Sequence, residues 1–199
     1  MRPVFYTEIC KPTYELLRWL NANACKDETR PQIQSIRIHE GGKILEATNG
    51  MTLVRVKLNE ELKEKLPAGC WRILLLNSHS VVMEGKENYG YPDTAAVIKA
   101  WKWRDADDSD MSCVSVNAKL LGMVTAGFGQ IHIFITSSGY PVIVEMTTFK
   151  SNMPEGIYIG VLMPMHVGGD KSAAWSQMRK DVITCFNLDK AEKLEEVTQ

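Results

Sequence analysis

The chain has 199 residues, of which 45% are hydrophobic and 24% are charged, with 23 basic and 24 acidic side chains. This composition suffices for the core of one domain or two small ones. The near-zero net charge excludes a polybasic nucleic-acid binder of the tail type and a supercharged acidic protein, but it is compatible with a local basic stripe that binds DNA.

The N-terminal sequence and the cysteines indicate the compartment. No segment reaches the ~18 consecutive apolar residues of a membrane span, and the N-terminus lacks the apolar run and cleavage site of a signal peptide. The five cysteines are widely spaced with no C-x-x-C pair, which favours reduced thiols over disulfides or a zinc site. We therefore expect a cytoplasmic protein with no membrane partner, metal or cofactor.

The first part of the chain predicts a helix followed by three strands. Thr13 follows a proline and is expected to cap a helix that runs to about Lys26. The apolar face of this helix would consist of Leu16, Leu17, Leu20 and Ala24. Strands are expected over residues 32–39, 44–48 and 51–58, separated by Gly-Gly and Asn-Gly turns.

The same order of elements recurs downstream. A short strand is expected over residues 112–116, followed by a helix that Asn117 caps. Three further strands are expected over residues 131–136, 141–146 and 157–164. The chain therefore contains a duplicated unit of one strand, one helix and three strands.

Two such units predict an α+β fold. Each helix has to bury its apolar stripe on the sheet that follows it, so two units joined sheet to sheet place both helices on one face. The polar sides of the helices would then share one surface.

The remaining residues complete the expected organisation. A connecting segment, residues 59–111, contains two expected strands, 70–76 and 80–84. We expect one domain over residues 1–166, with half-units 1–58 and 112–166 on either side of that segment. A helical tail over residues 167–199 would follow, because apolar residues recur there at helical spacing, namely Trp175, Met178, Val182 and Phe186.

Other chemistry has weaker signals. The acidic run at 105–110 lacks the glycine and the final glutamate of a calcium loop, which favours a solvated loop. The four histidines are scattered, and no catalytic motif is present. The cluster at 101–104 (WKWR) fits either base stacking or ordinary packing of one ring.

Four segments in order resemble the bacterial DNA polymerase III beta subunit, the sliding clamp. They are ILEATNGMTLVRV (44–56), YGYPDTAAVI (89–98), SVNAKLLGMV (115–124) and VLMPMH (161–166). The resemblance covers about residues 4–166. It implies a DNA-clamp-like fold and a non-catalytic processivity factor, a ring that tethers a polymerase or repair enzyme to duplex DNA.

The resemblance places the helices inside the ring, facing DNA. Sequence-independent sliding requires Lys or Arg on that face, because phosphates attract such cations without any base readout. The candidates are Lys11, Arg18, Lys26 and Lys119. The alternative is that these are the solvated faces of amphipathic helices, and Glu15 on the same face favours that alternative.

The resemblance also implies a groove that captures peptide motifs of replication proteins. One wall would consist of Thr48, Gly50, Met51, Thr52 and Leu53, and the other of Met163, Pro164 and Met165. Flexible methionines suit such a groove because they repack around different ligands. The alternative is that Leu53 and Met163 are core residues and Gly50 only satisfies a turn.

The chain departs from the family in size and in the groove. The family carries three domains per chain, so a ring built from this chain would need about six copies joined head to tail in a homo-oligomer. Met51 and Thr52 stand where the family has a His-Arg pair, and His166 stands where it has arginine. The rival prediction is a clamp-derived adaptor that binds peptides without encircling DNA, and an enzyme on the same scaffold is a third.

Overall fold

The computed structural model of the protein describes residues 2–86, 90–99, 116–134, 142–147 and 152–163. All of them belong to one compact unit, Met1–Met165. Several predictions lie outside the described residues: the 101–104 cluster, the acidic run at 105–110, all but the last residue of the strand expected at 112–116, and the tail at 167–199. Among the described helices, none is long and apolar enough to span a bilayer.

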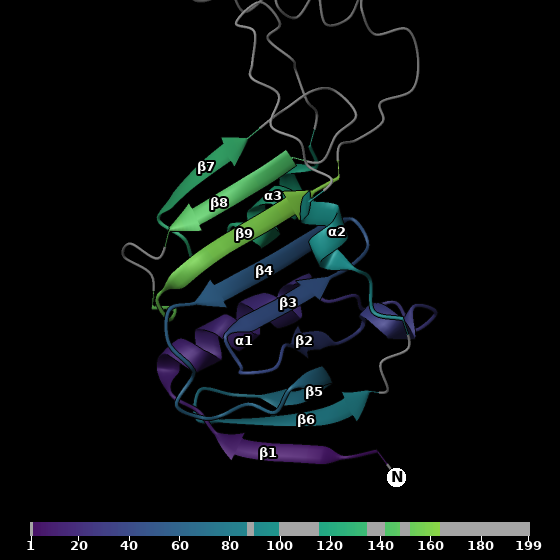
Figure 1. The fold of residues 1–199 in the computed structure, drawn as a ribbon, viewed down its shortest axis with the longest axis vertical. Helices are drawn as coiled ribbons and strands as arrows, with labels where there is room; N and C mark the ends of the chain where they lie inside the picture. The colour runs from purple at the N-terminus through teal and green to yellow at the C-terminus, as the bar shows by residue number, and fades with distance from the viewer. Residues whose placement is uncertain (1, 87–89, 100–115, 135–141, 148–151, 164–199) are drawn as a thin grey trace, which may run out of the picture. The chain divides into compact units, whose positions relative to one another are not determined.

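The described strands form one antiparallel sheet in the order β1-β6-β5-β2-β3-β4-β9-β8-β7 (Figure 1). The strands are β1 (Val4–Glu8), β2 (Ile36–Ile38), β3 (Ile44–Thr48), β4 (Thr52–Leu58), β5 (Gly69–Leu76), β6 (Ser80–Lys86), β7 (Gln130–Phe134), β8 (Val142–Thr147) and β9 (Gly156–Leu162). The order β2-β3-β4 in the first half-unit is mirrored by β7-β8-β9 in the second.

The two half-units meet where β4 pairs with β9. This seam runs from Thr52 opposite Leu162 to Leu58 opposite Gly156. The predicted edge-to-edge joining of two similar units is therefore confirmed. Strands β5 and β6 of the connecting segment extend the same sheet on the far side of β2.

Both main helices cover the same face of the sheet, as predicted. Helix α1 (Lys11–Asn23) packs against β3, β4 and β5, whereas α3 (Ala118–Val124) packs against β4 and β9. The two helices also contact each other, and Figure 1 shows both on the side of the sheet away from the viewer. A short helix, α2 (Thr94–Lys99), and a 3-10 turn at Pro31–Ile33 complete the described elements.

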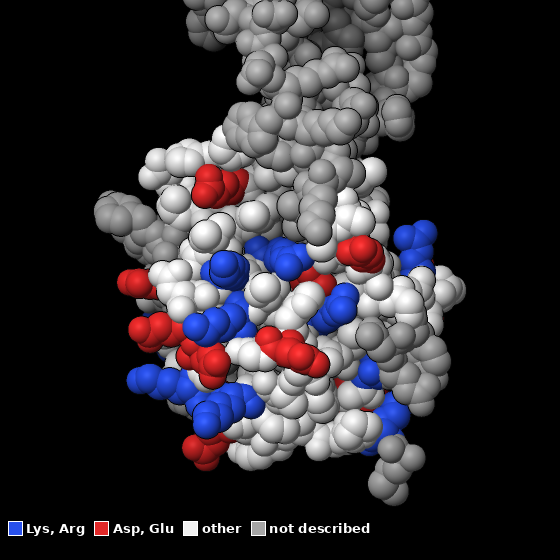
Figure 2. Space-filling model, in the orientation of Figure 1, with Lys and Arg blue, Asp and Glu red and all other residues white. Residues whose placement is uncertain are grey.

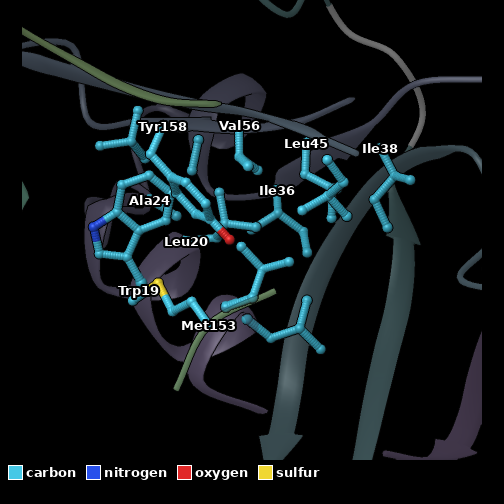
Figure 3. Packing of buried hydrophobic residues seen from close by; sticks show 14 of the residues in the cluster. Trp19, Leu20, Ala24, Ile36, Ile38, Leu45, Val56, Met153 and Tyr158 are labelled. Carbon is cyan, nitrogen blue, oxygen red and sulfur yellow. The ribbon is translucent and has the colours of Figure 1, made fainter. Parts of the chain in front are cut away.

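The core lies between the helices and the sheet (Figure 3). An aromatic cluster joins the two half-units there, since the Trp19 ring centroid lies 5.5 Å from those of Phe128 and Tyr158. The Trp19 indole Nε1–H donates to the Val124 carbonyl at 2.7 Å. This buried bond satisfies a carbonyl near the end of α3 and ties that helix to α1.

The start and end of the first helix differ from the prediction. Helix α1 begins at Lys11 with Cys10 as its N-cap, and Thr13 instead lies inside the helix. The Thr13 hydroxyl donates to Glu64 Oε2 at 2.9 Å, and a proline in the first turn suits the earlier start. The helix ends at Asn23, because Ala24 is extended, so Lys26 lies beyond it.

The bounds of two elements were not predicted, and one strand is shorter than expected. Strand β1 and helix α2 carried no strong periodic signal, since each is only a few residues long. The strand expected at 32–39 is reduced to β2, because Pro31–Ile33 forms a 3-10 turn. The Asn117 cap is confirmed: its side chain accepts the N–H groups of Lys119 and Leu120.

Gly160 offers a test of the contact between α3 and the sheet. A Cβ at Gly160 would overlap the buried Val124 side chain, so we expect Gly160→Ala to lower the free energy of unfolding by about 1–3 kcal/mol. Gly122→Ala is the matched control, because its Cβ meets nothing within 4 Å and alanine favours a helix by about 0.5–1 kcal/mol. Urea denaturation would compare the two, and equal unfolding midpoints would contradict the packing.

Candidate functional site

The sheet has one face covered by helices and an opposite face, which we call the outer face. Along β4, Val54, Val56 and Leu58 belong to the core under the helices. The alternate residues Leu53 and Arg55 therefore point to the outer face. Figure 2 shows this face, on which acidic and basic side chains are interspersed.

A rigid turn joins β3 to β4 at one end of the seam. The Thr48 hydroxyl donates to the Thr52 carbonyl at 2.6 Å and accepts the Gly50 N–H at 3.1 Å. Asn49 Oδ1 accepts the N–H groups of Met51 and Thr52 at 2.9 and 2.8 Å. Gly50 has a φ of 87°, a conformation that favours glycine. The turn is therefore held by side-chain bonds on both sides.

A small apolar cluster occupies the outer face beside this turn. Leu53, Ile143 and Val161 are buried together, and Phe134 and Ile159 pack against them. Since these residues come from β4, β9, β8 and β7, the cluster crosses the seam. Leu53 is thus a packed residue, but on the outer face and outside the main core.

Two exposed methionines border that cluster. Met51 is 54% exposed and Met163 is 50% exposed. They are held side by side, because the Met163 N–H donates to the Met51 carbonyl at 3.0 Å. The structure therefore brings together Thr48, Met51, Leu53 and Met163, residues that lie in two segments more than 100 positions apart.

The other predicted groove residues contribute differently. The Thr52 side chain is 2% exposed and lies on the helix-covered face, like its partner Leu162. Only the backbone of Thr52 therefore belongs to the turn, whereas Gly50 is exposed at its tip. Pro164 and Met165 lie outside the described residues.

Arg30, which the sequence motifs did not predict, lies beside this turn. A Cβ on Gly50 would lie 3.0 Å from Arg30 Nη1. The Arg30 side chain is 56% exposed, and its Nε lies 3.9 Å from Asp27 Oδ2. A guanidinium thus stands close to the position where Met51 and Thr52 lack the family's cations. No local signal identifies it, because Arg30 precedes the turn by about 20 residues.

A buried carboxylate anchors the connecting segment to the outer face. Glu46 on β3 is fully buried, and its Oε2 accepts the Thr94 hydroxyl at 2.6 Å. Arg37 Nη1 lies 3.7 Å from Glu46 Oε1, and Arg55 Nη1 lies 3.5 Å from Glu46 Oε2. These two guanidinium groups compensate for the burial of the carboxylate charge. Arg37 lies 5.5 Å from the Tyr91 ring centroid, and burial together with Glu46 raises the pKa of Tyr91.

The four predicted DNA-facing cations do not form one uniform patch. Lys11 on α1 and Lys119 on α3 are exposed on the helix-covered side. Arg18 is also exposed, but its Nη2 lies 2.6 Å from Glu15 Oε2 and forms an ion pair with it. Lys26 Nζ donates to the carbonyl and side-chain oxygens of Asn21 at 2.8 and 3.0 Å, and burial, with a contribution from Arg72, lowers its pKa.

The described residues contain no constellation for metal chemistry. No group of three or more His, Cys, Asp or Glu side chains within them could hold a metal ion. Cys10 and Cys25 are free thiols. The residues predicted for peptide and DNA binding lie in or beside the outer-face cluster and on the helix-covered side.

Comparison with known proteins gives structural matches only. No protein-family model and no curated protein sequence match the chain. The DNA polymerase III beta subunit of Borrelia burgdorferi matches with a TM-score of 0.53 and 13% identity, covering 84% of this chain and 65% of that one. The beta clamp of Helicobacter pylori matches with a TM-score of 0.52 and 10% identity, covering 84% and 68%. The beta subunit of Thermotoga maritima matches with a TM-score of 0.50 and 13% identity, covering 83% of this chain and 66% of that one.

These matches establish the fold. The chain has the DNA-clamp-like α+β fold that the four sequence segments predicted. Its similarity to sliding-clamp structures is confirmed in three dimensions, although the chain spans just under two thirds of the Borrelia protein.

Proposed function

We propose that the protein is a non-catalytic, sliding-clamp-like factor that assembles into a ring and tethers a polymerase or repair enzyme to duplex DNA. The observation that supports this most strongly is the layout of the fold, in which one continuous sheet carries both helices on a single face. A ring of such units would present helices to DNA and sheet to solvent. The proposed setting is the cytoplasm.

The helix-covered face has the charges for weak phosphate contacts. Lys11 and Lys119 are exposed there on different half-units, and such contacts attract DNA of any sequence. The Arg18 pair with Glu15 reduces this attraction, because the carboxylate neutralises the guanidinium at close range. We therefore expect weak binding of duplex DNA, as sliding requires, with an affinity that falls steeply as the salt concentration rises.

The outer-face cluster supports capture of partner peptides. Met51 and Met163 offer exposed apolar side chains of an adaptable type, beside a turn that the Thr48 and Asn49 side chains hold by hydrogen bonds. Apolar grooves flanked by fixed backbone groups are typical of peptide sites. The partner would be a DNA polymerase or another replication protein with a clamp-binding motif.

A second candidate is an adaptor that binds peptides without encircling DNA. The Arg18–Glu15 pair favours it, because one of the predicted DNA contacts is internally neutralised. The adaptor requires the same groove but neither a ring nor a basic face. DNA binding therefore separates the two candidates, whereas peptide binding supports both.

Charge reversal on the helices tests the DNA proposal. We expect Lys11→Glu combined with Lys119→Glu to weaken binding of duplex DNA and to flatten the salt dependence by about 0.9 in log–log slope for each lost phosphate contact. Lys57→Glu is the control, because Lys57 lies opposite Ile157 in the seam and points to the outer face. Fluorescence anisotropy over a salt series measures the slopes, and equal losses in both variants would contradict the assignment.

Substitutions at the seam test the groove. We expect Met163→Asp to raise the dissociation constant of a fluorescent clamp-binding-motif peptide at least about tenfold, which corresponds to roughly 1.4 kcal/mol. The reason is that a charge would replace an apolar contact. Ile157→Asp is the matched control: it is 52% exposed, against 50% for Met163, and lies at the other end of β9. If the peptide binds both variants equally well, the groove lies elsewhere.

A further inference from the structure

Strand β1 forms one end of the sheet, and its outer edge has no pairing strand among the described residues. Of the described strands it pairs only with β6, from Val4 opposite Glu84 to Glu8 opposite Ser80 (Figure 1). An unpaired edge presents backbone N–H and C=O groups that can pair with another chain.

The hydrogen bonds to β6 determine which residues face the free edge. The Gly85 N–H donates to the Pro3 carbonyl, and the Ile9 N–H donates to the His79 carbonyl, both at 2.8 Å. Odd-numbered residues of β1 therefore direct their backbone groups toward β6. Because this direction alternates along a strand, Val4 and Tyr6 direct theirs to the free edge. The missing N–H of Pro3 is on the β6 side and does not block that edge.

The side chains of the same residues are apolar and exposed. Val4 is 65% exposed and Tyr6 is 61% exposed. Phe5 between them packs against the core under the helices, so Val4 and Tyr6 lie on the outer face. Tyr6 continues an apolar row, because it is paired with Val82, which is paired with the 55%-exposed Leu75.

Charges of opposite sign flank this apolar pair. Arg2 and Glu8 are both exposed and share the even-numbered alternation with Val4 and Tyr6. If a second β1 runs antiparallel with Phe5 opposite Phe5, Arg2 faces Glu8 and Val4 faces Tyr6. A parallel arrangement in the same alignment would instead place like charges together, so the charges favour the antiparallel one.

We propose that β1 is a self-association edge through which two copies of the chain pair their sheets around Phe5. Each facing pair of even-numbered residues exchanges backbone hydrogen bonds, and the apolar row of one sheet continues into the other. The contact is twofold and self-complementary, so a ring that contains it would alternate this contact with a second kind of contact instead of joining the copies head to tail. The inference goes beyond the proposed tether and depends on neither DNA nor peptide binding.

A charge-swap series tests this pairing in the full chain. We expect the unmodified protein to self-associate as its concentration rises, with a dimer as the first assembled species, in light scattering and sedimentation equilibrium. Arg2→Glu and Glu8→Arg should each raise the dimer dissociation constant at least about tenfold, because each leaves like charges facing. The combined variant should restore association, since the reversed charges again face their opposites.

The Arg2 substitution also changes an ion pair within the chain, because Arg2 Nη1 lies 3.6 Å from Glu84 Oε1. A mixing experiment therefore tests the same pairing without changing Arg2. A Val4→Asp chain and a Tyr6→Lys chain should associate with each other more tightly than either does with itself. The double variant Glu40→Lys with Lys43→Glu is the control, because both residues are exposed in the turn before β3.

Two outcomes would overturn the proposal. One is a strict monomer at every concentration. The other is a dimer that the combined charge swap does not restore and whose mixed chains show no preference, which would indicate pairing of β1 with a different edge such as β7. DNA and peptide binding can be measured on the same variants, so failure of this contact is distinguishable from failure of the proposed function.

Discussion

The pairing of β4 with β9 is the interaction on which the rest of the structure depends. It converts two half-units into one sheet, and the Trp19 bond to the Val124 carbonyl repeats that connection in the helix layer. Because the sheet is continuous, α1 and α3 both lie on one side of it, and the outer-face cluster lies on the other. Loss of the seam would remove both candidate sites together.

The seam also builds the outer-face cluster. Leu53 and Val161 are direct partners across it, and Met51 and Met163 are joined by a backbone bond at its end. Residues that are more than 100 positions apart in the sequence thus become neighbours, because β4 and β9 are hydrogen-bonded to each other. Glu46, one strand away, fastens the connecting segment to the same face through Thr94. The proposed groove would therefore be lined by residues that the sheet holds in place, which a peptide site requires to keep its shape.

Local patterns predicted much of this fold, and long-range contacts explain what they missed. The bounds of β3 were predicted because its strand is followed by an Asn-Gly turn, and Asn117 acts as the expected cap. The helix start was wrong because Glu64, 51 positions away, engages the Thr13 hydroxyl. For the same reason Arg30 was not predicted, since it reaches the Gly50 turn from a separate loop. Motif order predicted that residues 48–53 and Met163 lie together, but only the register shows that Thr52 faces the helices.

Retention on circular and linear DNA tests the central claim most directly. A closed ring of about six copies should remain on a circular plasmid through a gel-filtration column and leave it once the plasmid is linearised, because a ring slides off a free end. A protein held only by phosphate contacts would be lost equally from both forms at the same salt concentration. Retention that depends on circularity would support the tether. Equal loss, with peptide binding intact, would contradict the ring and leave the adaptor as the function.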